Sequence, residues 1–276
     1  MRLAVLSDLH SNHIALRACL TACGAVDGYV LLGDYVSDLA YPQKTLAVLR
    51  TLAAEKPCTF LRGNREDYML SYRAQPGAWR YGNSTGSLLY TFARLTERDF
   101  AWFAEMPIAC TLRLPGCPPL LCCHGSPSSN TEERRCITDE LLRGIESPML
   151  LCGHTHQQEL YVADGKTLLN PGAVGLAIGS GGGAAQCALL DGGADGWQPT
   201  LLTVPYDLAA AEYELAESGL IDCAGVWPRA VRKALRTGVD YPLQCVRRAR
   251  ALAAEAGVAD GAPDRFWNQA AAELEL

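Results

Sequence analysis

The first half of the chain alternates short apolar runs with amphipathic stretches, and this alternation constrains the fold more than any other feature. Apolar, β-prone runs at 1–7, 29–32 and 58–61 are separated by helical patterns at 13–23 and 42–54. Strands that alternate with helices form parallel sheets, because each helical crossover returns the chain to the same end of the sheet. The pattern therefore predicts an α/β domain.

The rest of the chain divides into a helical segment, a strand-rich part and a helical tail. Residues 67–106 have a helical pattern, and the sequence becomes helical again after Pro205. The intervening expected strands lie at 108–114, 119–123, 149–152, 160–163, 166–169, 186–190 and 198–204, with one helix at about 138–145. We expect one domain over 1–204, in which 67–106 walls the pocket, and a C-terminal helical extension over 205–276.

Charge and hydropathy exclude several classes of function. The 276 residues carry 24 Lys and Arg against 30 Asp and Glu, whereas general nucleic-acid and membrane binders need clustered cations. Nowhere do eighteen apolar residues occur in succession, and the apolar run at the N-terminus is too short for a secretory signal. We expect a soluble, cytoplasmic protein with no membrane partner and no strong nucleic-acid signal.

The twelve cysteines are interpreted as reduced thiols in the core. The chain is large and shows no export signal, so a disulfide framework is not expected. No Cys-x-x-Cys pair is present, which argues against a zinc ribbon. Most of these residues lie inside apolar patterns, where cysteine behaves as a small buried hydrophobe.

Polar residues follow five of the apolar runs, at the points where the expected strands end. The motifs are Asp8-Leu9-His10, Gly33-Asp34, Gly63-Asn64, Cys123-His124-Gly125 and Gly153-His154-Thr155-His156. Residues just beyond the carboxyl ends of strands in an α/β sheet converge on the ligand crevice. Five such loops predict a single shared site.

The residue types in these motifs point to metal chemistry. Imidazole, carboxylate and amide donors together suit borderline divalent ions such as Mn, Fe, Zn or Co better than magnesium alone. Closed structural zinc sites typically use cysteine, which is missing from the set. The sequence thus favours an open, catalytic metal site.

The ordered motifs resemble those of the calcineurin-like metallophosphoesterases, which run Asp-x-His, Gly-Asp, Gly-Asn-His, a His near a Gly, and Gly-His-x-His. Asn170-Pro171-Gly172 also resembles the family's Asn-Pro-Gly turn. The resemblance covers roughly residues 1–204 and implies a four-layer α/β/β/α sandwich. It also implies hydrolysis of phosphate esters.

The resemblance further implies that seven residues hold two divalent metal ions. Asp8, His10 and His156 would hold one ion, Asn64, His124 and His154 the other, and Asp34 would bridge both. A shared carboxylate brings two cations close enough to activate one water and to clamp the attacked phosphoryl group. Asn64 can serve both metal and phosphate, and Asn12 is expected to steady the first loop and to contribute to substrate binding.

Arg65 departs from the family pattern, because most members have a histidine after the Gly-Asn motif. A guanidinium can bind phosphate bidentately but cannot readily give up a proton. Arg65 is therefore expected to clamp phosphate, with the leaving group protonated by water, the substrate, Glu66 or Asp67. The alternative is that Arg65 pairs with Glu66 or Asp67 outside the site.

Other polar and aromatic residues have two interpretations each, and the structural one is preferred. His13 is expected to begin a helix, and Asp38 to be solvated at the surface. The aromatic residues within 67–106 could stack on a nucleobase, but a packing face is favoured. Arg247, with Arg248 and Arg250, is expected on a solvated helix face.

The leading functional hypothesis is a metal-dependent phosphodiesterase or phosphomonoesterase that acts on a small phosphorylated molecule, with nucleotides among the candidates. A dinucleoside polyphosphate hydrolase and a protein phosphatase remain alternatives within the family. A metal-containing binding or scaffold protein without turnover is the alternative from another class. The sequence does not determine the oligomeric state.

Overall fold

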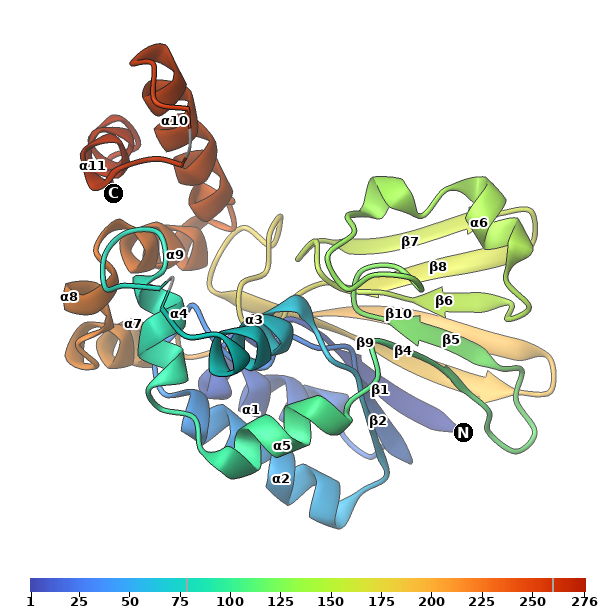
Figure 1. Cartoon of the computed structure of the whole chain (residues 1–276). Helices are drawn as coiled ribbons and strands as arrows, with labels where there is room; N and C mark the ends of the chain where they lie inside the picture. Colours follow the sequence, from blue (N-terminus) through green and yellow to red (C-terminus); the bar gives the residue numbers. More distant parts are fainter. Residues whose placement is uncertain (78, 260) are drawn as a thin grey trace.

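The computed structural model describes residues 1–77, 79–259 and 261–276, which build two five-stranded sheets (Figure 1). The first sheet has the order β10-β9-β1-β2-β3. Its strands are β1 (Arg2–Leu6), β2 (Gly28–Leu31), β3 (Cys58–Phe60), β9 (Ala184–Gly193) and β10 (Gly196–Pro205). The first three are parallel, and β9 runs antiparallel to β1.

The second sheet has the order β4-β5-β6-β8-β7. Its strands are β4 (Ala109–Leu112), β5 (Leu120–Cys123), β6 (Met149–Leu151), β7 (Gln158–Ala163) and β8 (Lys166–Pro171). The three central strands β5, β6 and β8 are parallel, and the two edge strands are antiparallel to their neighbours. Every strand expected from the sequence is present, with ends shifted by a few residues. The largest shift is in β9, which is lengthened by its pairing with both β1 and β10.

The alternation of side chains along the strands places the two sheets face to face. On β1, Leu3 and Val5 pack toward the second sheet, whereas Ala4 and Leu6 pack toward the helices. From the second sheet, Leu120 and Met149 enter the same intersheet core. Because successive side chains of a strand point to opposite faces, β1 is buried on both sides.

Helices cover the outer face of each sheet. The first sheet is covered by α1 (His13–Cys23), α2 (Pro42–Glu55) and α5 (Glu97–Glu105), and the second by α6 (Asp139–Gly144) with a 3₁₀ turn at Arg134–Cys136. The layers are thus helix, sheet, sheet, helix, which confirms the predicted four-layer α/β/β/α sandwich.

Residues 67–106 contain most of α3 (Asn64–Ala74) together with α4 (Gly86–Phe92) and α5, with position 78 outside the described residues. Their aromatic side chains pack on one another: Tyr72 stacks on Trp79 with ring centroids 4.2 Å apart, and Phe92 meets the edge of Tyr72 at 4.8 Å. This cluster continues into the core beneath the first sheet, as the preferred interpretation expects.

The chain after residue 205 is helical, with position 260 outside the described residues. It contains α7 (Leu208–Glu217), α8 (Leu220–Ala224), α9 (Val226–Thr237), α10 (Tyr241–Glu255) and α11 (Asp264–Glu273). The first three pack with α4 around Tyr90 and Leu220, while α10 and α11 pack on α9 and project beside the sandwich (Figure 1). Among the described residues, no helix is long and apolar enough to cross a bilayer.

The cysteines are free thiols, and eleven of the twelve are buried or half-buried. Cys23 and Cys187, whose Sγ atoms are 3.9 Å apart, lie between α1 and the first sheet. Cys136 is the exposed exception. The prediction that most cysteines lie in or against the core is therefore confirmed.

Candidate active site

The seven residues predicted as metal ligands lie together where the two sheets end. Asp8 and His10 follow β1, Asp34 follows β2, Asn64 follows β3, His124 follows β5, and His154 and His156 follow β6. Five of the seven are buried, whereas His154 and His156 are half-buried at the opening. The loops meet because the parallel strands of each sheet finish at the same edge.

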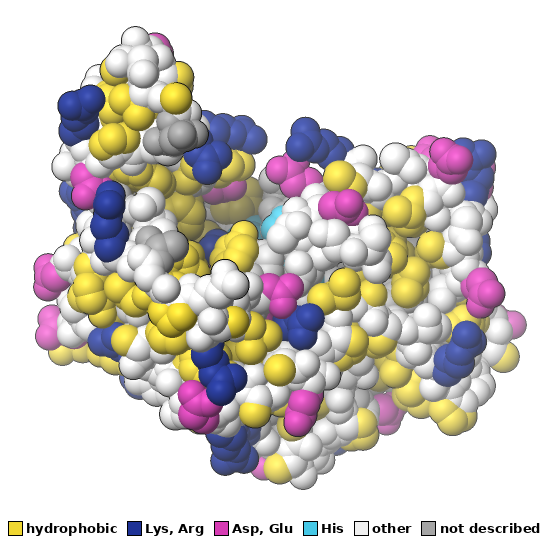
Figure 2. Space-filling view, viewed as in Figure 1, with side chains coloured by type: hydrophobic (Ala, Val, Ile, Leu, Met, Phe, Trp, Pro, Cys, Tyr) yellow, Lys and Arg dark blue, Asp and Glu magenta, His cyan; other side chains and the backbone are white. Residues whose placement is uncertain are grey.

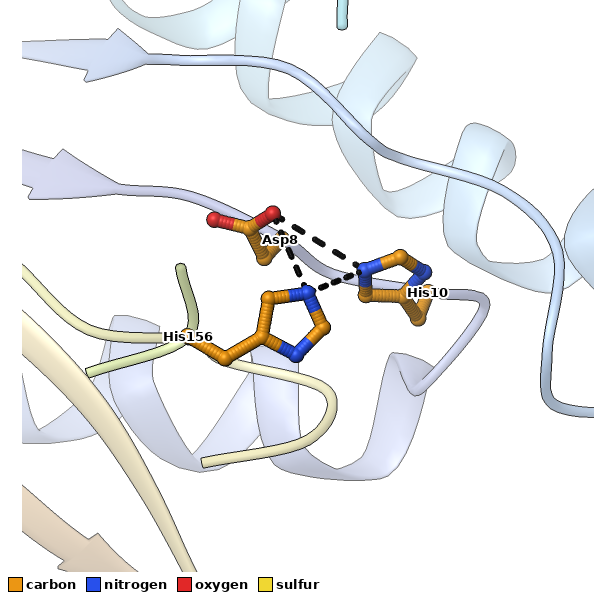
Figure 3. A group of neighbouring side chains, drawn as sticks. All are labelled: Asp8, His10 and His156. Carbon is orange, nitrogen blue, oxygen red and sulfur yellow. Dashed lines mark hydrogen bonds and ion pairs between the residues drawn. The ribbon is translucent and has the colours of Figure 1, made fainter. Parts of the chain in front are cut away.

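One group of possible metal ligands comprises Asp8, His10 and His156 (Figure 3). His156 Nε2 is 3.4 Å from Asp8 Oδ1 and 3.0 Å from His10 Nε2, and His10 Nε2 is 3.8 Å from the same carboxylate oxygen. Two imidazole nitrogens and one carboxylate oxygen therefore face a common point. Such a donor set suits a borderline divalent cation.

The second group comprises Asp8, Asp34 and His124. His124 Nε2 is 3.5 Å from Asp34 Oδ2 and 3.1 Å from Asn64 Oδ1. The same Asp34 oxygen lies 3.8 Å from His10 Nε2 in the first group. The His154 ring joins this side of the site, with its centroid 5.2 Å from that of His124. Asp34 thus lies between two sets of nitrogen donors.

The second nitrogen of three of these histidines contacts a fixed acceptor. His124 Nδ1 is 2.9 Å from the Leu32 carbonyl, and His156 Nδ1 is 3.0 Å from the Leu176 carbonyl. His10 Nδ1 is 2.9 Å from Asp38 Oδ2. Partners of this kind fix the tautomer and the ring orientation, so that Nε2 is left available to a metal ion.

The backbone of the site adopts conformations that L-residues rarely take. Positive φ angles between 45° and 69° occur at Asp8, His10, Asp34, His154 and His156. Such residues persist only where surrounding contacts hold them, and they cluster at functional sites. Part of that support comes from close backbone approach: a Cβ on Gly33 would come within 2.9 Å of His124 Nδ1, and one on Gly63 would collide with the Asp34 carboxylate.

Glu66 holds two of the loops together. Its buried carboxylate accepts hydrogen bonds from the backbone N–H groups of Asp34, Tyr35 and Gly63, at 2.8 to 3.0 Å. Burial and the nearby charge of Asp34 raise the pKa of Glu66 to about 7. Asp67 pairs with Arg62 Nε at 2.6 Å. The sequence-based alternative in which Arg65 pairs with Glu66 or Asp67 is therefore wrong, because both carboxylates are engaged elsewhere.

The electrostatics of the site favour a cation. Burial opposes charge on His10, yet contacts with Asp38 and Asp8 raise its pKa to about 10. Burial would likewise raise the pKa of Asp34, but the charge of His124 lowers it to about 2. Asp8 Oδ1 is buried and finds no hydrogen-bond partner in the described part of the chain. A buried acceptor without a donor is costly, so the residues fit a divalent cation.

Arg65 and Asp38 form a contact beside the histidines. Arg65 Nη2 is 3.1 Å from Asp38 Oδ2, and Arg65 Nε is 3.8 Å from Asp34 Oδ2. The other Asp38 oxygen accepts a hydrogen bond of 2.9 Å from Trp227 Nε1. Asp38 is only 2% exposed. The expectation that it is solvated at the surface is wrong, because three side chains from different elements enclose it.

Asn12 and His13 have structural contacts. Asn12 Oδ1 accepts the N–H of Ala15 at 3.0 Å and caps α1, while Asn12 Nδ2 donates to the Gly175 carbonyl at 3.2 Å. These bonds steady the loop that carries Asp8 and His10. His13 begins α1, as predicted, and its Nε2 is 2.8 Å from Glu214 Oε2 on α7.

The site opens into a cleft of about 690 Å³, which Figure 2 shows as a hollow with histidine at its floor. Arg65, His154 and His156 line the cleft at the metal-ligand cluster, and residues 133–135, 155 and 157–159 form one side. The other side is formed by α9, α10 and the residue before α10: Trp227, Asp240, Pro242, Leu243, Val246 and Arg247. The C-terminal extension is therefore a wall of the cleft.

A family model of the calcineurin-like phosphoesterase superfamily domain matches residues 1–193. The chain belongs to this superfamily. A solved metallophosphoesterase from Sphaerobacter thermophilus is 25% identical, with a TM-score of 0.67 over 87% of this chain and 100% of that one. A hypothetical protein from Pyrococcus horikoshii OT3 is 20% identical, with a TM-score of 0.71 over 86% of this chain and 98% of that one. The search of curated proteins found no match.

Membership of the superfamily defines the general chemistry of this metallophosphoesterase. It is a hydrolase that acts on phosphate esters, and its Asp and His groups could hold the divalent metal that the superfamily uses. Sequence reasoning did not assign Asp38 or Trp227 to the site. Asp38 had one signal, its place in the loop that follows Asp34. Trp227 had none, because it lies far along the chain in a helix with no motif.

Proposed function

We propose that this metallophosphoesterase hydrolyses diesters and monoesters of phosphate with two divalent cations, drawn from Mn, Fe, Zn and Co. The observation that carries the proposal is the position of the Asp34 carboxylate, with Oδ2 3.8 Å from His10 Nε2 and 3.5 Å from His124 Nε2. The proposed ligands are Asp8, His10 and His156 for one ion, Asn64, His124 and His154 for the other, and Asp34 for both. Two bound cations would lower the pKa of a shared water and neutralise the phosphoryl oxygens.

Arg65 is proposed to clamp the phosphate of the substrate. Arg65 lines the cleft, and the contact with Asp38 orients its guanidinium. Asp38 and Asp34 raise the pKa of Arg65 further, against the effect of burial. Arg65 therefore keeps its proton and donates hydrogen bonds to phosphate oxygens, as charge develops on them. Asn64 is proposed to donate from its Nδ2 group to the same phosphate.

A permanently charged Arg65 predicts selectivity for the leaving group. Without a proton donor at that position, esters of acidic alcohols and phosphoanhydrides are hydrolysed faster than alkyl esters. Rates for a series of phosphate esters with graded leaving-group pKa test this idea. A rate that does not depend on leaving-group pKa would refute it.

The decisive experiment uses metal-stripped protein with bis-p-nitrophenyl phosphate and p-nitrophenyl phosphate. Each of Mn, Fe, Zn, Co and Mg is added back separately, with Asp34→Asn as the control variant. Turnover restored by metal in the parent protein but not in Asp34→Asn supports the proposal and ranks diester against monoester. Metal binding without turnover of either ester would instead support the non-catalytic alternative.

A further inference from the structure

The helices that form the outer wall of the cleft present an aromatic ring beside the metal-ligand cluster. Trp227, in the first turn of α9, lines the cleft and is half-buried. Its indole N–H is occupied by Asp38 at 2.9 Å, and Asp38 in turn contacts His10 and Arg65. The ring is therefore held at a fixed place, and it can offer a ligand only its apolar surface.

The wall next to Trp227 is also apolar. Pro242, Leu243 and Val246 come from the first half of α10, and Leu176 from the loop that carries the acceptor of His156 Nδ1. Leu243 is 41% exposed although it faces a cleft that leads to charged groups. A phosphate group alone would not use such a wall, because its oxygens need donors. The wall suits an apolar or aromatic group that is attached to the phosphate.

Apart from Arg65, which is proposed to clamp the reacting phosphate, the charged groups described along the cleft leave one cation for a ligand. Arg134 pairs with Glu159 at 2.8 Å, Arg135 with Glu133 at 3.3 Å, and Asp240 caps α10 through the N–H of Leu243. Arg247 is exposed on α10 at the edge of the cleft, and no carboxylate in the described part of the chain pairs with it. It could meet an anion at the far end of a substrate.

We propose that this wall is a subsite for the nucleoside part of a nucleotide ester. The base stacks on Trp227 and the apolar residues of α10, and a further phosphate on the sugar reaches Arg247. The cleft of about 690 Å³ lies in the size range of small-ligand sites. The inference rests on the proposed hydrolysis at the metal-ligand cluster, and it assigns the C-terminal extension a role in substrate selection. An aromatic wall with a single outer cation favours a nucleotide over a phosphopeptide or a lipid phosphate.

Three diesters with the same p-nitrophenolate leaving group test the subsite. They carry methyl, thymidine (through its 5′ oxygen), or thymidine with a 3′-phosphate as the second ester group. In each, water attacks phosphorus and the bond to p-nitrophenolate breaks, so that only the retained group differs. We expect kcat/KM to rise at least about 5-fold from methyl to thymidine, as stacking of one base on an aromatic ring provides. The 3′-phosphate adds a further rise of about 3-fold.

Variants on α10 separate the subsite from the chemistry. Leu243→Ser lowers the preference for thymidine over methyl, and Arg247→Gln removes the gain from the 3′-phosphate. Arg250→Gln is the matched control, because Arg250 is exposed on the same helix and is not among the residues that line the cleft. It leaves all three rates unchanged. Equal kcat/KM for the three diesters in the parent protein would overturn the subsite while leaving the hydrolytic function intact.

Calorimetry gives a readout that needs no turnover. Metal-loaded protein is titrated with thymidine 3′,5′-bisphosphate, with methyl phosphate and with a phosphoserine peptide. The bisphosphate is expected to bind at least about 5-fold more tightly than methyl phosphate, and Arg247→Gln to reduce this difference. Equal affinities, or tighter binding of the peptide, would overturn the inference. If no ester is hydrolysed with any metal, the proposed function fails, and this titration still decides whether the subsite exists.

Discussion

The metal-ligand cluster and the cleft wall on α9 and α10 are built in opposite ways. In the cluster, buried side chains on strained loops are held by backbone and carboxylate contacts from several strands. In the wall, Leu243 and Arg247 are exposed on a helix surface and have few partners. The difference teaches that substitutions at exposed positions of the wall, such as Leu243 and Arg247, can test the proposed substrate selection without disturbing the buried cluster.

The largest effect is expected for Asp34→Asn, which tests whether the cluster acts as one unit. The amide keeps the shape of the side chain but removes the charge that lies between His10 and His124. Turnover of bis-p-nitrophenyl phosphate should fall about 1,000-fold, because the electrostatic stabilisation at the phosphoryl group is lost. Bound metal per chain, measured by elemental analysis, should fall as well. If Asp34→Asn keeps an activity within about 10-fold of the parent protein, the cluster does not act as one unit.

The support beneath the cluster is tested by Glu66→Ala. Three buried backbone N–H groups lose their acceptor, which should lower the free energy of unfolding by about 3 kcal/mol in urea titrations. Asp67→Ala is the control on the same helix, because the Asp67 carboxylate is partly exposed and contacts two side chains, Arg62 and Asn130, each at 2.6 Å, rather than backbone N–H groups. It should cost no more than about 1 kcal/mol. Equal losses in the two variants would show that Glu66 has no special role in the loops.

Trp227→Phe tests the point at which wall and cluster meet. The aromatic ring is kept, but Asp38 loses its 2.9 Å donor and holds His10 less firmly. Metal affinity, measured by competition with a chelator, should weaken about 10-fold, as is common when a partner of a metal-binding histidine is disturbed. Trp102→Phe is the matched control, because Trp102 packs on Phe60 at the outer side of the first sheet. Unchanged metal affinity in Trp227→Phe would mean that the extension does not support the centre.

The smallest effect concerns the contact that attaches α7 to the α/β domain. Burial would raise the pKa of Glu214, but its contacts with Lys44 and His13 lower it. A carboxylate with a lowered folded-state pKa stabilises the protein above its unfolded-state pKa of about 4.3, and the contribution is lost as the pH falls through the folded-state pKa. Glu214→Gln should therefore lower the free energy of unfolding by up to about 1 kcal/mol at pH 7. The difference should shrink as the pH falls below about 4.3 and vanish once Glu214 is protonated in the folded protein; a difference that persists in acid would exclude a charge effect.

Most of the fold could be predicted from the sequence, because local patterns specify it. The periodicity of 13–23 gives α1 its observed bounds, and the apolar run of β1 has the composition of a strand buried on both faces. The convergence of the polar motifs could also be predicted, since residues that follow parallel strands end at one edge of a sheet. The resemblance to the superfamily supplied the four-layer arrangement, which periodicity alone did not.

Only the tertiary structure decided how the site is supported and what walls it. Asp38 has the sequence character of a solvated residue, yet Trp227 reaches it across 189 positions in the chain. Arg65 contacts Asp38 rather than its sequence neighbours Glu66 and Asp67. The sequence by itself determined the strands, helices and polar motifs, because these depend on interactions between near neighbours. The partners of Asp38 and the placement of α10 over the cleft depend on packing between distant segments, which no local pattern records.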